Sequence, residues 1–277
     1  MKIEINTLPL FPVLDGCLLA LLQSLRDEDW EKPTICSRWT VKDIAAHLLD
    51  GNIRGLATSR DGYFGLPAPE GESYGQLVEY INRHNMNWTT AARRISPRML
   101  IRLLEITGHE YNEHLADLDP FGDAIFPVAW AGQDRSPNWL HTAREYSEKF
   151  LHQQQIRDAL NRPGIMTRQF FYPFLDTLMY GLPHTFRDTQ ADEGTRVMLE
   201  VTGDVGGIWS VVKKSSGWHK LPADGSQANA HVRLDPDTAW KLFSGSRKPQ
   251  DVLDRVSIEG DKDLGQQALR MVSFMVA

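Results

Sequence analysis

The sequence predicts a two-domain α+β protein, in which a helical bundle is followed by a small domain of strands and helices. Up to about residue 162, apolar residues recur at helical spacing and the segments begin at cap signals. After Gly194 the hydrophobic period changes to two, and short alternating runs are separated by Gly or Asp. The length of 277 residues also favours two domains over one. We therefore expect a bundle over residues 1–162, a bridging segment over 163–193 and an α+β domain over 194–277.

The composition is ordinary for a soluble globular protein, with 42% hydrophobic and 24% charged residues. The net charge of −6 and the absence of any basic run argue against nucleic-acid binding. No apolar run approaches the roughly 20 residues that a membrane span needs, and the apolar stretch 8–25 has the spacing of an amphipathic helix rather than of a signal peptide. Cys17 and Cys36 are too few for a disulfide framework and fit a reducing compartment. We therefore expect a cytoplasmic protein with no membrane partner.

Five helices are expected in the bundle, over about residues 14–26, 40–60, 74–95, 97–118 and 137–161. Capping-box and Ser-Pro patterns start four of them, at Thr40, Ser73, Ser96 and Ser136. Residues 61–71 are rich in Gly and Pro and are expected to form a loop. Only loops separate these helices, which indicates antiparallel packing.

Three residues on two of these helices form a candidate metal site. His47 lies at the edge of the apolar stripe of the second helix, and Glu148 and His152 are four apart on the last one, so they share a helix face. Two histidines and one carboxylate leave one coordination position open, which is the usual form of a catalytic zinc site. A hydrogen-bonded core histidine and a surface Glu–His pair explain the same spacing. The residues alone leave both interpretations open.

The second domain is expected to hold mostly antiparallel strands, over residues 197–201, 208–213, 218–221, 231–234 and 256–259. Gly203 is interpreted as a hairpin turn, because a phosphate loop would precede a helix. Asp235 caps a short helix over residues 238–243, and a final helix runs from residue 261 through Val272. The segment 165–193 is expected to carry a short apolar helix.

One further motif superficially resembles a zinc-protease helix and is rejected. His109 and His114 are five residues apart, whereas the HExxH pattern needs histidines four apart. Glu110 or Glu113 stays open as an outer partner of a metal-bound histidine.

With these residues in place, the chain resembles the mycothiol-dependent maleylpyruvate isomerase family, within the DinB-like superfamily of metal-binding four-helix bundles. The stretch from Trp39 through Asp43 to His47 looks like the family's W-x-V-x-D-hydrophobic-x-x-H signature, and Glu148-x-x-x-His152 is the second match. Residues 235–245, with 256–261 and Leu264, are similar to the family's second domain, a small fold related to sterol carrier proteins.

The resemblance implies that His47, Glu148 and His152 bind zinc, with nickel as an alternative. It also implies a low-molecular-weight thiol such as mycothiol as cosubstrate, held as a thiolate that attacks a small-molecule electrophile. The outcome is cis–trans isomerisation or S-transfer. The family uses an arginine of its second domain to bind an anionic substrate, for which Arg233 and Arg247 are the candidates. Two alternatives stay open: a metal-dependent hydrolase that uses metal-bound water, and a non-catalytic binding protein. The thiol, the electrophile and the oligomeric state are not readable from the sequence.

Overall fold

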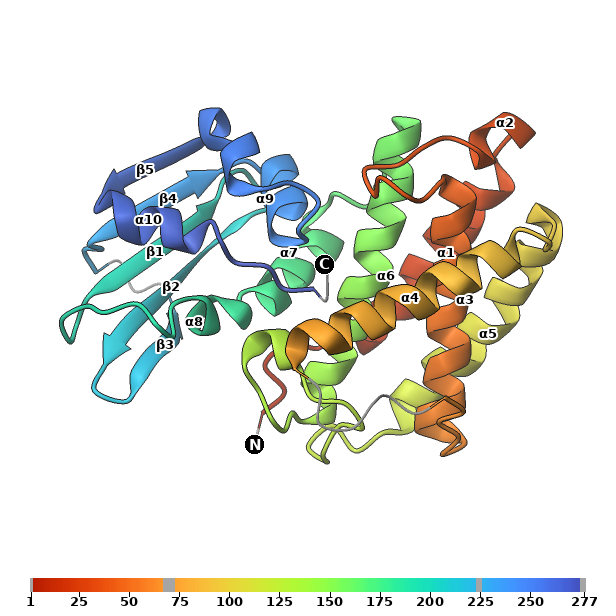
Figure 1. Cartoon of the computed structure of the whole chain (residues 1–277), viewed down its shortest axis with the longest axis horizontal. Coiled ribbons are helices and arrows are strands. Elements are labelled where there is room, and N and C mark those ends of the chain that lie inside the picture. Colours follow the sequence, from red (N-terminus) through yellow and green to blue (C-terminus); the bar gives the residue numbers. More distant parts are fainter. Residues whose placement is uncertain (1, 67–72, 223–225, 275–277) are drawn as a thin grey trace. The chain divides into compact units, whose positions relative to one another are not determined.

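The structure, a computed structural model, describes residues 2–66, 73–222 and 226–274 (Figure 1). The described residues fall into two units. One unit comprises residues 2–125 and 137–165, and the other comprises 126–136 and 166–274. Residues 67–71 of the loop expected over 61–71 lie outside the described residues.

The first unit is helical. Helix α3 packs against α4, α5 and α6, while α1 packs against α5 and α6 (Figure 1). Their apolar faces meet in a core that includes Leu22, Ile44, Leu49, Leu100 and Ile156. The elements of this unit are α1 (Phe11–Gln23), α2 (Asp27–Trp30), α3 (Val41–Gly55), α4 (Tyr74–Ala92), α5 (Pro97–Asp117) and α6 (Asn138–Leu160).

Three of the four predicted helix caps are confirmed. The Thr40 hydroxyl accepts from the backbone N–H of Asp43, and the Asp43 carboxylate accepts from the N–H of Thr40, which completes a capping box. Ser73 and Gln76 repeat this arrangement at the start of α4. Ser96 accepts from the N–H of the third residue of α5. Each side chain thereby satisfies a backbone donor that has no partner within its helix.

The predicted cap at Ser136 is wrong. Helix α6 begins after Pro137 with no side-chain cap. The Ser136 hydroxyl instead accepts from the backbone N–H of Val128 at 2.9 Å, within the loop that precedes α6. The backbone N–H of Val128 therefore binds the hydroxyl that would otherwise have capped α6.

The ends of the first two predicted helices also differ from the structure. Helix α1 starts at Phe11, before the predicted start at about residue 14. Pro12 fits in its first turn, because a backbone N–H at that position would have no hydrogen-bond partner within the helix. Residues 27–30, which follow the end of the first predicted helix, form the short helix α2. The α-helical part of α3 ends at Gly55, and a π-helical turn over Leu56–Arg60 follows it directly.

The second unit is built on a five-stranded sheet of order β3-β2-β1-β4-β5. Strand β1 runs parallel to β4, and all other neighbouring strands are antiparallel. The sheet is therefore mostly antiparallel, as predicted. Val197, Leu199 and Val201 are buried while the residues between them are half-buried, so the predicted alternation is confirmed. The strands are β1 (Arg196–Val201), β2 (Gly207–Lys214), β3 (Gly217–Pro222), β4 (Ala230–Leu234) and β5 (Val256–Gly260).

Four helices accompany the sheet in the described residues: α7 (Arg168–Leu178), α8 (Gly181–Thr185), α9 (Pro236–Phe243) and α10 (Lys262–Ala268). Asp235 caps α9, as predicted, by accepting from the N–H of Thr238. Two helices stand where one short apolar helix was expected in residues 165–193. The last helix is shorter than predicted, because it ends at Ala268, and Val272 is 38% exposed.

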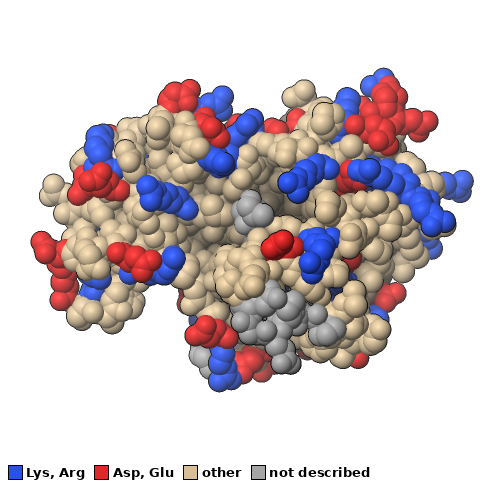
Figure 2. Space-filling view, in the orientation of Figure 1, with Lys and Arg blue, Asp and Glu red and all other residues tan. Residues whose placement is uncertain are grey.

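In the part of the chain that the structure describes, no helix is both long enough and apolar enough to cross a membrane. Figure 2 shows basic and acidic side chains interspersed over the face in view, with acidic side chains gathered at α2.

Candidate metal centre

Helices α3 and α6 bring His47, Glu148 and His152 together. One donor atom from each of the three lies within 4.8 Å of the others. The Nε2 atom of His152 lies 3.3 Å from Oε2 of Glu148, and the two imidazole rings meet edge to face with their centroids 4.6 Å apart. The three residues expected to share a site therefore do lie together.

His47 presents a polar atom that the surrounding protein does not satisfy. Its Nδ1 is buried, and none of the described residues offers it a hydrogen bond. Burial lowers the pKa of His47 well below its usual value, and the charges of His152 and Arg54 lower it further. A neutral imidazole is the form that binds a metal. An unpaired buried nitrogen costs free energy unless a ligand takes it, so this atom fits a metal donor.

His152 is held from its other side by Gln155. The Nδ1 atom of His152 lies 2.8 Å from Oε1 of Gln155 one turn along α6. An amide oxygen only accepts, so a hydrogen bond to it needs the ring proton on Nδ1, and Nε2 is the ring nitrogen that lies near Glu148.

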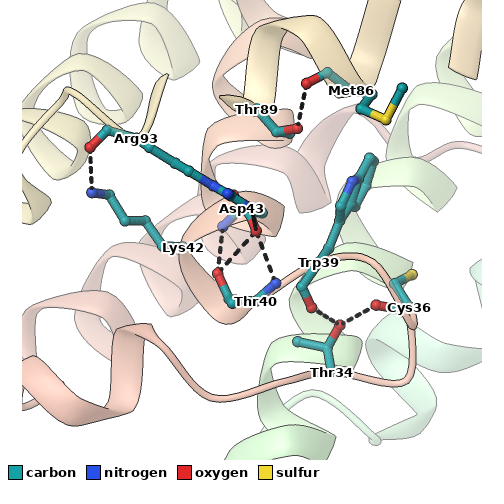
Figure 3. Close-up of polar contacts among 9 residues, drawn as sticks. All are labelled: Thr34, Cys36, Trp39, Thr40, Lys42, Asp43, Met86, Thr89 and Arg93. Atoms are coloured by element: carbon teal, nitrogen blue, oxygen red, sulfur yellow. Dashed lines mark hydrogen bonds and ion pairs between the residues drawn. The ribbon is translucent and has the colours of Figure 1, made fainter. Parts of the chain in front are cut away.

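Trp39 forms an aromatic wall beside both histidines. Its ring centroid lies 4.8 Å from that of His47 and 6.1 Å from that of His152. The backbone of Trp39 is fixed by its N–H, which donates to the carbonyl of Cys36, and by the Thr34 hydroxyl, which donates to the Trp39 carbonyl. Figure 3 shows the indole pointing away from this turn. Such a wall shields one side of the cluster from water.

A buried carboxylate anchors the start of the helix that carries His47. Asp43 is 2% exposed, completes the cap with Thr40 and accepts from the Arg93 guanidinium through both oxygens at 3.1 Å (Figure 3). Lys42 donates to the carbonyl of Arg93. These contacts join the first turn of α3 to the end of α4. They thereby fix the position of His47 along the axis of the bundle.

A second buried polar network lies one turn before Glu148 on α6, and sequence reasoning missed it. Glu145 accepts from the Tyr111 hydroxyl at 2.9 Å and from the Arg144 guanidinium. Burial raises the pKa of Glu145, but the charges of Arg144 and His141 and these hydrogen bonds outweigh it and lower the pKa to about 2. Burial lowers the pKa of His141 to about 4. No local pattern in the sequence signals this network, because Tyr111 and Glu145 lie on different helices.

Two other candidates are placed elsewhere by the structure. Glu110 is half-exposed and pairs with Arg60, and Glu113 is exposed on the same helix, so neither faces the cluster as an outer partner. The sequence left their orientation open because both positions flank the apolar stripe of α5.

The candidate substrate arginine lies in the second unit. Arg233 on β4 has Nε 3.3 Å from the Glu200 carboxylate, and His231 approaches the same oxygen at 2.9 Å. His231 and Arg233 share a sheet face, as their spacing predicts.

The fold and the cluster define a class: a mixed α+β protein whose helical unit carries two histidines and one carboxylate at a common point. The chain belongs to the mycothiol maleylpyruvate isomerase family, because the model of that family's N-terminal domain matches residues 14–157. The matched region contains the whole cluster.

Solved structures agree with this family at the level of the fold. Crystal structures of a mycothiol-dependent maleylpyruvate isomerase and of a histidine-to-alanine variant of it each superpose with a TM-score of 0.54 at 14% identity. Each comparison covers 94% of this chain and 93% of the other. Among curated protein sequences, no relative is found.

Proposed function

We propose that this chain is a metal-dependent enzyme of low-molecular-weight thiol chemistry, acting as an isomerase or S-transferase with mycothiol or a similar thiol as cosubstrate. The observation that carries the proposal is the convergence of His47, Glu148 and His152 within the family-matched region. The metal is zinc, with nickel as an alternative, and the substrate is a small electrophile.

The residues present fit a zinc ion. Donor atoms around one tetrahedral zinc lie roughly 3.4 Å apart, given zinc–nitrogen and zinc–oxygen bonds of about 2 Å. The three donors lie within 4.8 Å of one another, and Nε2 of His152 and Oε2 of Glu148, at 3.3 Å, already have this spacing. The unsatisfied Nδ1 of His47 supplies an independent reason to expect a ligand. Three protein donors leave one position for a thiol.

A bound zinc lowers the pKa of a thiol at its open position, so that the thiol reacts as a thiolate at neutral pH. The protein side chains have separate tasks. Burial keeps His47 neutral, the bond to Gln155 points Nε2 of His152 inward, and the Trp39 ring excludes water from one side. In the isomerase reaction the thiol adds to a cis double bond, the resulting single bond rotates, and elimination releases the trans isomer and the thiol.

The second unit is proposed to be similar to sterol carrier proteins, and Arg233 to bind an anionic group of the electrophile. The Arg233 side chain is 46% exposed, so its guanidinium is available for a carboxylate in addition to Glu200. The domain division proposed from sequence places this residue in the segment 194–277.

The two free cysteines fit a cytoplasmic location.

The test is turnover by the zinc-loaded protein with mycothiol and either maleylpyruvate or a chromogenic electrophile. We expect turnover that requires the thiol and that falls by about 100-fold or more in Glu148→Gln, whereas Glu113→Gln on the exposed face of α5 keeps it. Thiol-independent cleavage of an ester or amide would instead identify a hydrolase that uses metal-bound water. No turnover and no metal uptake would leave a binding protein.

A further inference from the structure

We propose that Gln155 is a positioning residue that fixes the ring tautomer and orientation of His152 and ties the loop around Cys36 to the same ring. The tautomer part of this proposal stands on its own. Its consequence for metal affinity rests on the proposed function.

The hydrogen bond to His152 is short and enclosed. Oε1 of Gln155 lies 2.8 Å from Nδ1 of His152, and the two residues are only 2% and 8% exposed. Water therefore does not compete for the ring nitrogen. A neutral histidine has one N–H, so placing it on Nδ1 leaves Nε2 as the lone-pair atom, 3.3 Å from Glu148. The ring thus offers its lone pair to the cluster.

The amide of Gln155 is itself oriented by a second contact. Its side chain is hydrogen-bonded to the thiol of Cys36, in the loop before α3. Burial raises the pKa of this thiol to about 11, so it stays neutral at pH 7. The Cys36 carbonyl in turn accepts from the N–H of Trp39 at 2.8 Å. One side chain on α6 therefore links the ring of His152 to the loop that carries the aromatic wall.

The neighbouring glutamines show that this role belongs to one position. Gln153 joins helices, because its amide donates to the carbonyl of Leu14 and its oxygen accepts from Arg157. Gln154 is 9% exposed, and no hydrogen bond between described residues joins it to the cluster. Gln154 is thus a matched control with the same side chain and similar burial on the same helix.

The chemistry of the acceptor has a consequence for the site. Residues that orient a metal-bound histidine are often carboxylates, which raise the basicity of the ring. Gln155 orients the ring without adding negative charge. We therefore expect Gln155→Glu to preserve the tautomer, and Gln155→Leu, which removes the acceptor at similar volume, to lose it.

The experiment uses the full chain with ¹⁵N-labelled histidine and compares the wild type with Gln155→Leu, Gln155→Glu and Gln154→Leu. The first readout is the tautomer of His152 in the metal-free protein, from two-bond ¹H–¹⁵N correlation spectra assigned with a His152→Ala variant. We expect Nδ1–H in the wild type, Gln155→Glu and Gln154→Leu, and a mixed or Nε2–H state in Gln155→Leu. Circular dichroism checks that each variant is folded.

The second readout is zinc affinity by competition with a chromophoric chelator. Gln155→Leu should bind zinc about 10- to 100-fold more weakly than the wild type, and Gln154→Leu within about 2-fold of it. An Nε2–H tautomer in the wild type, or an unchanged tautomer in folded Gln155→Leu, overturns the proposal. If the tautomer responds as expected but the wild type takes up no zinc, the positioning role stands and the metal function fails.

Discussion

The imidazole rings of His47 and His152 lie edge to face, with an interplanar angle of 80° and their centroids 4.6 Å apart. They come from two helices joined by a long stretch of chain, so only tertiary packing brings them together. Trp39 contacts both rings and precedes the cap of α3.

Trp39→Ala should weaken both the fold and the cluster. Complete burial makes a Trp→Ala change cost about 3–5 kcal/mol, and Trp39 is only partly buried, so we expect the free energy of unfolding to fall by about 2 kcal/mol. Zinc should also dissociate faster, because water reaches the histidines. Urea denaturation and the rate of zinc transfer to a chelator measure the two effects. Trp39→Phe, which keeps an aromatic ring, should lose less; equal losses in both variants would contradict the wall.

Asp43 should make stability depend on pH in the acid range. Burial raises its pKa, but the hydrogen bonds from Arg93 and Thr40 outweigh burial, and the net pKa lies below the ordinary 3.8. A carboxylate with a lowered pKa in the folded state stabilises the fold above pH 3.8, and this contribution is lost as pH falls through the folded-state pKa.

Asp43→Asn should therefore lower the free energy of unfolding at pH 7 by about 1–2 kcal/mol. The difference from the wild type should shrink below pH 4. Denaturant titrations at several pH values test this. A difference that stays constant down to pH 2 would show that the Asp43 charge contributes nothing.

Gly55 should not tolerate a side chain. A Cβ atom there would overlap the ring of Tyr111, which is 2% exposed and held by its hydrogen bond to Glu145. Gly55→Ala should destabilise the protein by about 1–3 kcal/mol. Gly51→Ala is the control on the same helix, because nothing lies within 4 Å of its added Cβ. It should stabilise by about 0.5–1 kcal/mol. Equal melting temperatures for the two variants would refute this packing argument.

The sequence predicted what is local. The caps at Thr40, Ser73 and Ser96 depend on residues three apart, and the Glu148–His152 face depends on residues four apart. The strand alternation around Leu199 is equally local. Such local patterns can be predicted from the sequence, because the backbone geometry of a single helix or strand determines them.

Features that depend on packing between elements were less accessible. The cap at Ser136 failed because a buried loop N–H competes for its hydroxyl. The solvent-facing direction of Glu110 depends on its pairing with Arg60 from another segment. The contact of Gln155 with His152 is an i, i+3 pair, but three consecutive glutamines gave no reason to single it out. The ligand set of His47, Glu148 and His152 remains a prediction until a metal is measured.

The most direct measurement is the metal content of the purified protein by elemental analysis after mild dialysis. We predict about one zinc per chain in the wild type and in a His109→Ala, His114→Ala control, and none in His47→Ala, His152→Ala. The control removes two histidines of the rejected motif and leaves the cluster intact. A wild-type protein that holds no metal and takes up none on addition, or a double variant of the cluster that keeps stoichiometric zinc, would contradict the metal site.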